Sequence, residues 1–150
     1  SGMLLGNVNI RNVRLTAEDE IHDIGDINLI SRSTANEYRI NLSSKIANGQ
    51  YVGSAPVNDF VRDLMGITAK RELPSLFEDS RYEWSGETYK LNFEFEDARG
   101  ISGFIKPGLY IDNDTELVLD IDRLGDLSGA LRSHRLALNE KYIKDFELKT

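Results

Sequence analysis

The sequence of 150 residues predicts an α+β fold, in which a mostly antiparallel, twisted sheet (a meander) packs against one or two helices. Three patterns lead to this prediction. Apolar and polar residues alternate over residues 89–96, as in a strand with one buried face. Apolar residues repeat at helical spacing over residues 60–65. Short alternating segments separated by tight turns follow one another over residues 81–121, as in antiparallel sheets.

The N-terminal third is expected to consist of strands. Over residues 4–15, two apolar pairs with a slip of phase between them predict one bulged strand or two short strands. The acidic stretch 16–20 predicts a single helical turn. Two strands then flank a polar turn at residues 31–36, and Asn48-Gly49 predicts another turn. The alternating residues of these two strands are Ile27, Leu29, Tyr38, Ile40 and Leu42.

One helix is expected to begin at Pro56. Proline is tolerated in the first helical turn because the backbone N–H groups of that turn have no intrahelical acceptor, so the missing N–H of proline costs no hydrogen bond. Gly66 is placed to end this helix as its C-cap. The apolar face consists of Phe60, Val61, Leu64 and Met65. Such an amphipathic helix normally covers a core.

The second half contains further strand signals. Residues 81–84 alternate, and a strand at 101–105 follows the turn residues 97–100. Strands at 109–111 and 117–121 flank a polar turn, which completes the predicted meander.

The sequence does not decide the secondary structure of residues 123–150. Three leucines at helical spacing follow Asp122, which would cap a second helix. However, Gly125 and Gly129 would each cost that helix about 1 kcal/mol relative to alanine. Leu136 and Leu138 alternate as in a strand, whereas Tyr142, Ile143 and Phe146 fit a helix and also a loose strand.

The absence of linkers and repeats predicts one globular domain over residues 1–150, with Ser1 and Gly2 interpreted as the scar of a removed tag. Trp84 is expected at the edge of the core, and it would be a binding hot spot if it were exposed. The predicted core residues are Val8, Ile10, Phe60, Leu64, Tyr89, Leu91, Phe93, Phe95, Phe104, Leu117, Leu119 and Ile121.

Composition excludes several classes of protein. The chain has no cysteine, which removes disulfide scaffolds, cysteine zinc sites and cysteine nucleophiles. The net charge of −7 is the reverse of what duplex nucleic acid requires. No apolar run approaches the roughly 20 residues of a membrane span, and no signal peptide is visible. We therefore expect a cytoplasmic protein without cofactor, nucleic-acid partner or membrane partner.

No catalytic or metal-binding motif is recognisable. His22 and His134 lie far apart in sequence, and neither has a serine in a nucleophile-elbow context. Glu94 and Glu96 would suit carboxylate chemistry, but strict strand alternation already explains them as a solvated face. The aspartates at 112–116 and 120–126 begin like calcium loops, but both lack the later ligands. Phosphate-binding glycine loops are absent. We therefore predict no catalytic residue and no metal ligand.

The acidic surplus is uneven along the chain. Residues 1–75 carry a net charge of −1, residues 76–126 a net charge of −8, and residues 127–150 a net charge of +2. If the strands of the middle segment are neighbours, their outward carboxylates form one acidic sheet surface. Such a surface keeps a protein soluble, and it also steers association with a cationic partner.

The layout over residues 57–128 resembles small bacterial immunity proteins of the contact-toxin and polymorphic-toxin kind. The resemblance rests on the helix Asn58-Asp59-Phe60-Val61-Arg62-Asp63-Leu64, the segment Tyr82-Glu83-Trp84-Ser85-Gly86-Glu87, the strand and acidic turn Phe93-Glu94-Phe95-Glu96-Asp97-Ala98-Arg99-Gly100, and Glu116-Leu117-Val118-Leu119-Asp120. It implies a non-enzymatic α+β protein that binds and neutralises a cognate toxin.

We accordingly expect a protein-binding module that meets a basic partner, such as a toxin, through an acidic sheet face. The predicted contact residues are Glu83, Trp84, Glu94, Glu96, Asp120 and Asp122. A small carboxylate-based enzyme would need convergent carboxylates in a deep pocket. A carbohydrate-binding or structural accessory domain would need a groove lined by Trp84, Tyr82 and Tyr110. The sequence does not decide the oligomeric state.

Overall fold

A computed structural model describes residues 4–17, 20–72, 83–96, 109–138 and 141–149. These residues form one helix, α1 (Val57–Glu72), and nine strands. The strands are β1 (Leu4–Ala17), β2 (Glu20–Ser33), β3 (Tyr38–Ser44), β4 (Ala47–Gly53), β5 (Tyr89–Phe95), β6 (Leu109–Ile111), β7 (Thr115–Ile121), β8 (Leu127–Leu138) and β9 (Lys141–Lys149). Within these ranges, no helix has the length and apolar character that a membrane span requires.

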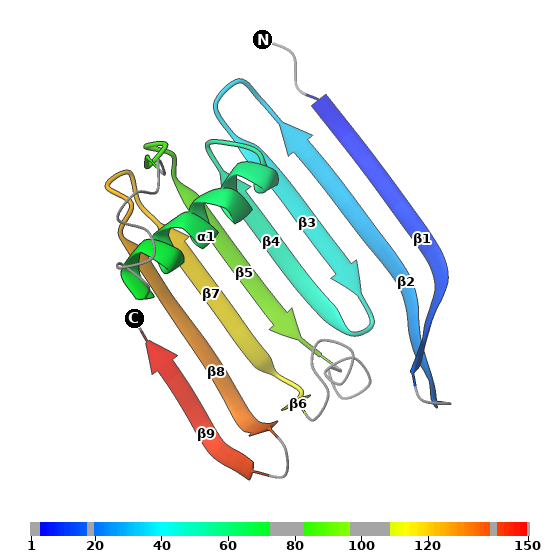
Figure 1. The fold of residues 1–150 in the computed structure, drawn as a ribbon. Helices are drawn as coiled ribbons and strands as arrows, with labels where there is room; N and C mark the ends of the chain where they lie inside the picture. The colour runs from blue at the N-terminus through cyan, green and yellow to red at the C-terminus, as the bar shows by residue number, and fades with distance from the viewer. Residues whose placement is uncertain (1–3, 18–19, 73–82, 97–108, 139–140, 150) are drawn as a thin grey trace.

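All nine strands belong to one antiparallel sheet, crossed on one face by α1 (Figure 1). The strands lie in the order β1-β2-β3-β4-β5-β7-β8, and β9 pairs with the far edge of β8. β6 also pairs with β8, beyond the residues of β8 that pair with β7, so β6 and β7 follow one another along β8. The predicted α+β class is therefore confirmed, although the sheet dominates. The turn at residues 112–114 connects β6 to β7, which both pair with β8 and not with each other.

The first two strands form a long hairpin that replaces the helical turn predicted at residues 16–20. Thr16 pairs with Ile21 and Ala17 with Glu20, so the described residues of this stretch belong to strands and not to a helical turn. The register shifts between Ile10 and Val13, as the slip of phase predicts. Asn12 at this irregularity has a left-handed φ of 55°.

The hairpin between β3 and β4 turns at residues 44–47, not at Asn48-Gly49 as predicted. The hydroxyl of Ser44 accepts hydrogen bonds from the N–H groups of Ile46 and Ala47, at 3.3 and 3.1 Å. Serine therefore supplies the turn chemistry. Asn48 and Gly49 instead continue β4, where they pair with Ser43 and Leu42.

Helix α1 covers the sheet with a compact aromatic cluster. Phe60 is buried, with its ring centroid 5.7 Å from that of Tyr51 and 5.5 Å from that of Tyr89. Ile121 of β7 completes the buried cluster and is fully inaccessible to solvent. The helix runs past Gly66 to Glu72, so the C-cap predicted at that glycine is wrong, because Ile67 continues the face that packs on the cluster.

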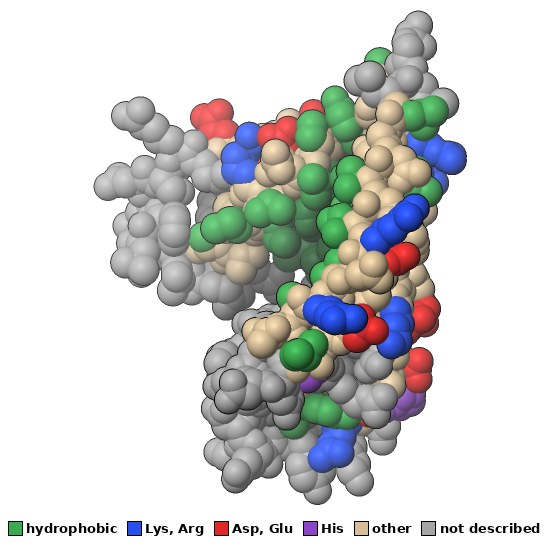
Figure 2. All heavy atoms as spheres, turned by 90° about the vertical axis from the view of Figure 1, so that its right-hand side faces the viewer, with side chains coloured by type: hydrophobic (Ala, Val, Ile, Leu, Met, Phe, Trp, Pro, Cys, Tyr) green, Lys and Arg blue, Asp and Glu red, His purple; other side chains and the backbone are tan. Residues whose placement is uncertain are grey.

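The sheet has two unlike faces, which we call the covered face, toward α1, and the outer face. Hydrophobic side chains line the covered face, and charged side chains lie mainly on the other side (Figure 2). Val8 and Ile10 were predicted in the core, but they are 53% and 47% exposed. Their strand lies at the edge of the sheet, beyond the reach of α1 (Figure 1). Phe104 falls outside the described residues.

The C-terminal region is strand, and the helix predicted after Asp122 does not form. β8 pairs with β7 on one edge and with β9 on the other. Gly129 lies against the side chain of Leu119, where a Cβ atom would be 2.7 Å from a leucine methyl. A glycine that weakens a helix therefore permits this close approach in a strand.

Gly49 offers a test of the packing on the covered face. A Cβ atom at this glycine would be 2.5 Å from the ring of Phe93, whereas one at Gly6 of β1 would meet nothing closer than 3.8 Å. Gly49→Ala should therefore destabilise the fold by about 1–3 kcal/mol through displacement of the ring. Gly6→Ala should be neutral or slightly stabilising. Urea unfolding of both variants checks this, and equal free energies of unfolding would contradict it.

Candidate binding surface

The outer face is built from cross-strand rows of polar side chains. One row contains Asn28, Ser43, Asn48, Glu94, Glu116 and Arg132. The next row contains Ile30, Asn41, Gln50, Asn92, Val118 and Ala130. Directly paired residues on neighbouring antiparallel strands share a face, so the register alone assembles these rows. The face is consequently rich in carboxamides, with acidic side chains at one end.

Three carboxylates gather near the end of β5, and we call them the acidic row: Glu94, Glu96 and Glu116. Glu94 pairs directly with Glu116 of β7. The amide nitrogen of Asn48 donates a hydrogen bond to Glu96. Glu94 is exposed, and its carboxylate makes no hydrogen bond or ion pair with any other described residue. Two of the predicted contact residues therefore lie together, and Glu116 is a neighbour that the prediction did not include.

Basic side chains offset part of the acidic charge on this face. Asp120, which was predicted to contact the partner, lies 3.4 Å from the Nζ of Lys90. Glu116 lies 3.4 Å from the guanidinium of Arg132. The middle segment is thus strongly acidic in sequence, but its sheet surface is mixed because a neighbouring strand and β5 itself contribute cations. Glu94 and Glu96 carry the charge that is least offset.

Asp122 has a structural position in the turn before β8. Its Oδ1 accepts hydrogen bonds from the backbone N–H groups of Leu124 and Asp126, at 2.8 and 3.0 Å. Gly125 in this turn has a left-handed φ of 82°, which favours glycine. Asp122 therefore shapes the turn and does not belong to the acidic row.

Trp84 packs at the edge of the core, as predicted, and not on the outer face. Its ring lies edge-on to that of Tyr89 at a centroid distance of 6.2 Å, and its Nε1 donates to the carbonyl of Arg123 at 2.9 Å. Glu83, beside it, is exposed in a non-strand segment away from the acidic row.

The aromatic groove considered for carbohydrate binding does not assemble. Trp84 lies by the turn before Leu127, whereas Tyr110 pairs with Ala137 near the other end of β8. These positions on β8 are about 33 Å apart at the usual rise per residue. Tyr82 falls outside the described residues.

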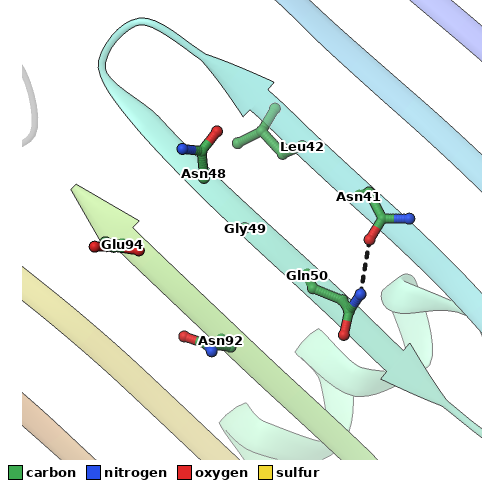
Figure 3. Close-up of a pocket in the computed structure, with 7 residues that line it drawn as sticks. All are labelled: Asn41, Leu42, Asn48, Gly49, Gln50, Asn92 and Glu94. Atoms are coloured by element: carbon green, nitrogen blue, oxygen red, sulfur yellow. Dashed lines mark hydrogen bonds between the residues drawn. The ribbon is translucent and has the colours of Figure 1, made fainter. Parts of the chain in front are cut away.

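A shallow hollow of about 350 Å³ lies on the outer face over β3, β4 and β5 (Figure 3). Its walls carry the side chains of Asn41, Asn48, Gln50, Asn92 and Glu94. Leu42 and Gly49 also line it, and their side-chain positions belong to the covered face, so they contribute backbone. Glu94 is the one carboxylate among the described lining residues. The hollow therefore offers polar binding groups but no described carboxylate pair.

A buried aspartate inside the helix packing was missed by sequence reasoning. Asp63 is 1% exposed, and its Oδ2 accepts hydrogen bonds from Ser85 at 2.6 Å and Tyr89 at 2.7 Å. Its Oδ1 lies 3.5 Å from Arg62. The signal was an aspartate three residues after Phe60, on the apolar face of α1. These contacts tie the helix to the segment that leads into β5, a structural role.

The two histidines do not share a site. His22 lies on β2 and His134 on β8, with four strands of the sheet between them. That separation is about 24 Å at the usual strand spacing. Within the described residues, no three His, Asp or Glu side chains are grouped so that they could hold a metal ion.

Comparison of the chain with protein-family models, curated proteins and solved structures gives no match.

Proposed function

We propose that this protein is a non-enzymatic binding module that recognises and inhibits a cationic partner protein, such as a cognate toxin, through its outer face. The observation that carries the proposal is Glu94, an exposed carboxylate at the centre of the acidic row without an ion pair among the described residues. The layout resemblance to toxin-immunity proteins supports the same class of partner.

Electrostatics support this function because like charges on paired strands cost stability. Glu94 and Glu116 are direct cross-strand neighbours, and like charges at such positions repel. Arg132 offsets the charge of Glu116, but no described residue forms an ion pair with Glu94. A partner with a basic surface would relieve this repulsion and would be steered to the face, with association up to a thousandfold faster than without steering. A polyanionic partner would be repelled by this face.

The shape of the face also favours a protein partner. The hollow is shallow, and the carboxamide side chains of its walls belong to cross-strand rows that continue onto β2 and β7. Protein interfaces bury about 800 Å² on each partner and use polar contacts around a few anchors. A face formed by five or more neighbouring strands supplies such an area, whereas a small substrate would use the hollow alone.

The test compares two charge reversals of equal size. The partner is first identified by co-purification from the native host and mass spectrometry, and is then produced as a pure protein. Glu94→Lys should slow its association about tenfold at low salt and reduce the salt dependence of the rate. Glu83→Lys changes the net charge equally at an exposed position away from the acidic row, and it should alter the rate less than about twofold.

Stopped-flow or surface-plasmon measurements of the association rate at several ionic strengths provide the readout. Equal rates for the two variants would remove the acidic row from the docking surface. A larger effect of Glu83→Lys would place the contact at the segment before β5 instead.

A further inference from the structure

Hydrogen bonds fix the orientation of the amide groups of Asn48 and Gln50 beside the hollow, and this orientation indicates which chemical group could bind there. Gln50 donates its amide N–H to Asn41 at 2.8 Å, as the dashed line in Figure 3 shows. Asn48 donates from its amide nitrogen to Glu96. Neighbouring side chains thus hold the nitrogen ends of both amides, and the hollow opens over Gly49 where the two side chains diverge.

The oxygens of these side chains remain available. The carbonyl oxygens of Gln50 and Asn48 accept no hydrogen bond from a described residue, and Asn92 makes none with either of its amide atoms. Glu94 adds a carboxylate without a described partner. Of the three amides that these hydrogen bonds orient, Asn48 and Gln50 leave their oxygens available, whereas Asn41 leaves its nitrogen available. With the carboxylate of Glu94, acceptors outnumber donors among these oriented groups, and one acceptor is charged.

We propose that the hollow receives the guanidinium group of an arginine side chain from the partner protein. Guanidinium carries five N–H donors and no acceptor, which matches an acceptor-rich wall. It keeps its positive charge at every physiological pH and pairs strongly with a carboxylate. This inference rests on the proposed function, because it names the anchor by which the partner would engage the outer face.

An ammonium group fits the hollow less well than a guanidinium group. The acceptors come from β4 and β5, whose backbones lie about 4.8 Å apart, so they are spread across the sheet. The planar fork of guanidinium reaches several separated acceptors at once, whereas ammonium is compact and more strongly hydrated. Arginine is also enriched among the residues that dominate binding energy at protein interfaces.

The size of the hollow agrees with one side chain. Its volume of about 350 Å³ is at the lower end of the range for ligand pockets, roughly 300–1,000 Å³. An arginine side chain and a few waters would occupy it, while the surrounding rows contact the rest of the partner. The hollow would therefore act as a specificity pocket inside a broader interface.

The test uses small probes and the whole chain, so it does not depend on knowing the partner. N-acetyl-arginine amide and N-acetyl-lysine amide are titrated separately into ¹⁵N-labelled protein, and the side-chain NH₂ resonances of Asn48, Gln50 and Asn92 are followed by NMR. The arginine probe should shift these signals with a Kd of about 10 mM, a value expected for one weak anchor. The lysine probe should bind at least about fivefold more weakly.

Two variants separate local recognition from general charge. Glu94→Gln should weaken arginine binding at least about fivefold, and Gln50→Leu should weaken it several-fold without any change of charge. Glu83→Gln, which removes an equal charge from an exposed position away from the hollow, should bind the probe like the parent chain. Both residues of the hollow are exposed, so neither substitution should disturb folding.

The outcomes distinguish this inference from the proposed function. If arginine and lysine probes shift the signals equally, or if Glu94→Gln binds arginine as well as the parent, the guanidinium pocket is wrong. If Glu94→Lys nevertheless slows association with the partner, the outer face still docks that partner without an arginine anchor. Selective arginine binding combined with an unchanged association rate would support the pocket and overturn the docking face.

Discussion

Phe60→Ala should lower the free energy of unfolding by about 3–5 kcal/mol, the usual cost of removing a buried phenylalanine. The ring of Phe60 packs between those of Tyr51 and Tyr89, and it anchors α1 on the sheet. Its removal leaves a cavity between the helix and two strands. Urea unfolding measured by circular dichroism gives the free energy directly.

The matched control is the next residue of the same helix. Val61 is 48% exposed, so Val61→Ala should change the free energy of unfolding by less than about 0.5 kcal/mol. Similar small losses in both variants would show that α1 does not depend on this aromatic cluster.

The protein should become less stable as the pH rises from about 10 toward 12, because two buried tyrosines resist ionisation in the folded state. Burial raises the pKa of Tyr51 well above the ordinary value of about 10, and nearby Tyr89 adds to the effect. Burial also raises the pKa of Tyr89, as does its hydrogen bond to Asp63. Both phenols then stay protonated in the folded state while the unfolded chain loses two protons.

The sign follows from proton linkage. A raised folded-state pKa gives stability that is fully present below pH 10 and decreases as the pH rises toward the folded-state value. Each tyrosine contributes a slope of about −1.4 kcal/mol per pH unit once the unfolded form is ionised. The loss therefore begins near pH 10, where the unfolded tyrosines titrate.

Phenylalanine substitutions isolate this contribution. Tyr89→Phe and Tyr51→Phe should each be less stable at pH 8, because Asp63 and the carbonyl of Ala55 lose a hydrogen-bond donor. Each should also remove about half of the alkaline loss. Val61→Ala, without an ionisable group, should keep the full slope. Unfolding curves at several pH values measure this, and an unchanged slope in both phenylalanine variants would contradict it.

The strand pattern over residues 89–96 and the helix pattern after Pro56 were confirmed, whereas the helical turn at 16–20 and the helix after Asp122 were wrong. Alternation over residues 89–96 gave β5 with its aromatic side facing α1, and the spacing after Pro56 gave the helix. These features depend only on which side of an element is apolar, and the sequence contains that information. The acidic end of β5 was likewise found from alternation, since it required only that Glu94 and Glu96 face away from the core.

Features that depend on pairing were not accessible from local pattern. Leu124, Leu127 and Leu131 also fit a short helix, and only pairing with two neighbouring strands makes residues 127–138 the strand β8. Ser44, and not Asn48-Gly49, makes the turn because the register of β3 on β4 places it at the hairpin end. Burial of Asp63 also needed the hydroxyl groups of Tyr89 and Ser85, which arrive from 26 and 22 residues away.

The sequence by itself determined that the chain is acidic, cysteine-free and rich in antiparallel strands, with Glu94 and Glu96 on an outward face. Only the tertiary structure decided which acidic side chains keep their charge unopposed. Cross-strand register brings Lys90 to Asp120 and Arg132 to Glu116, so part of the surplus is offset. The same register sets Asn48 and Gln50 around an open hollow. Charge is a property of composition, whereas a charged surface results from pairing between residues far apart in the chain.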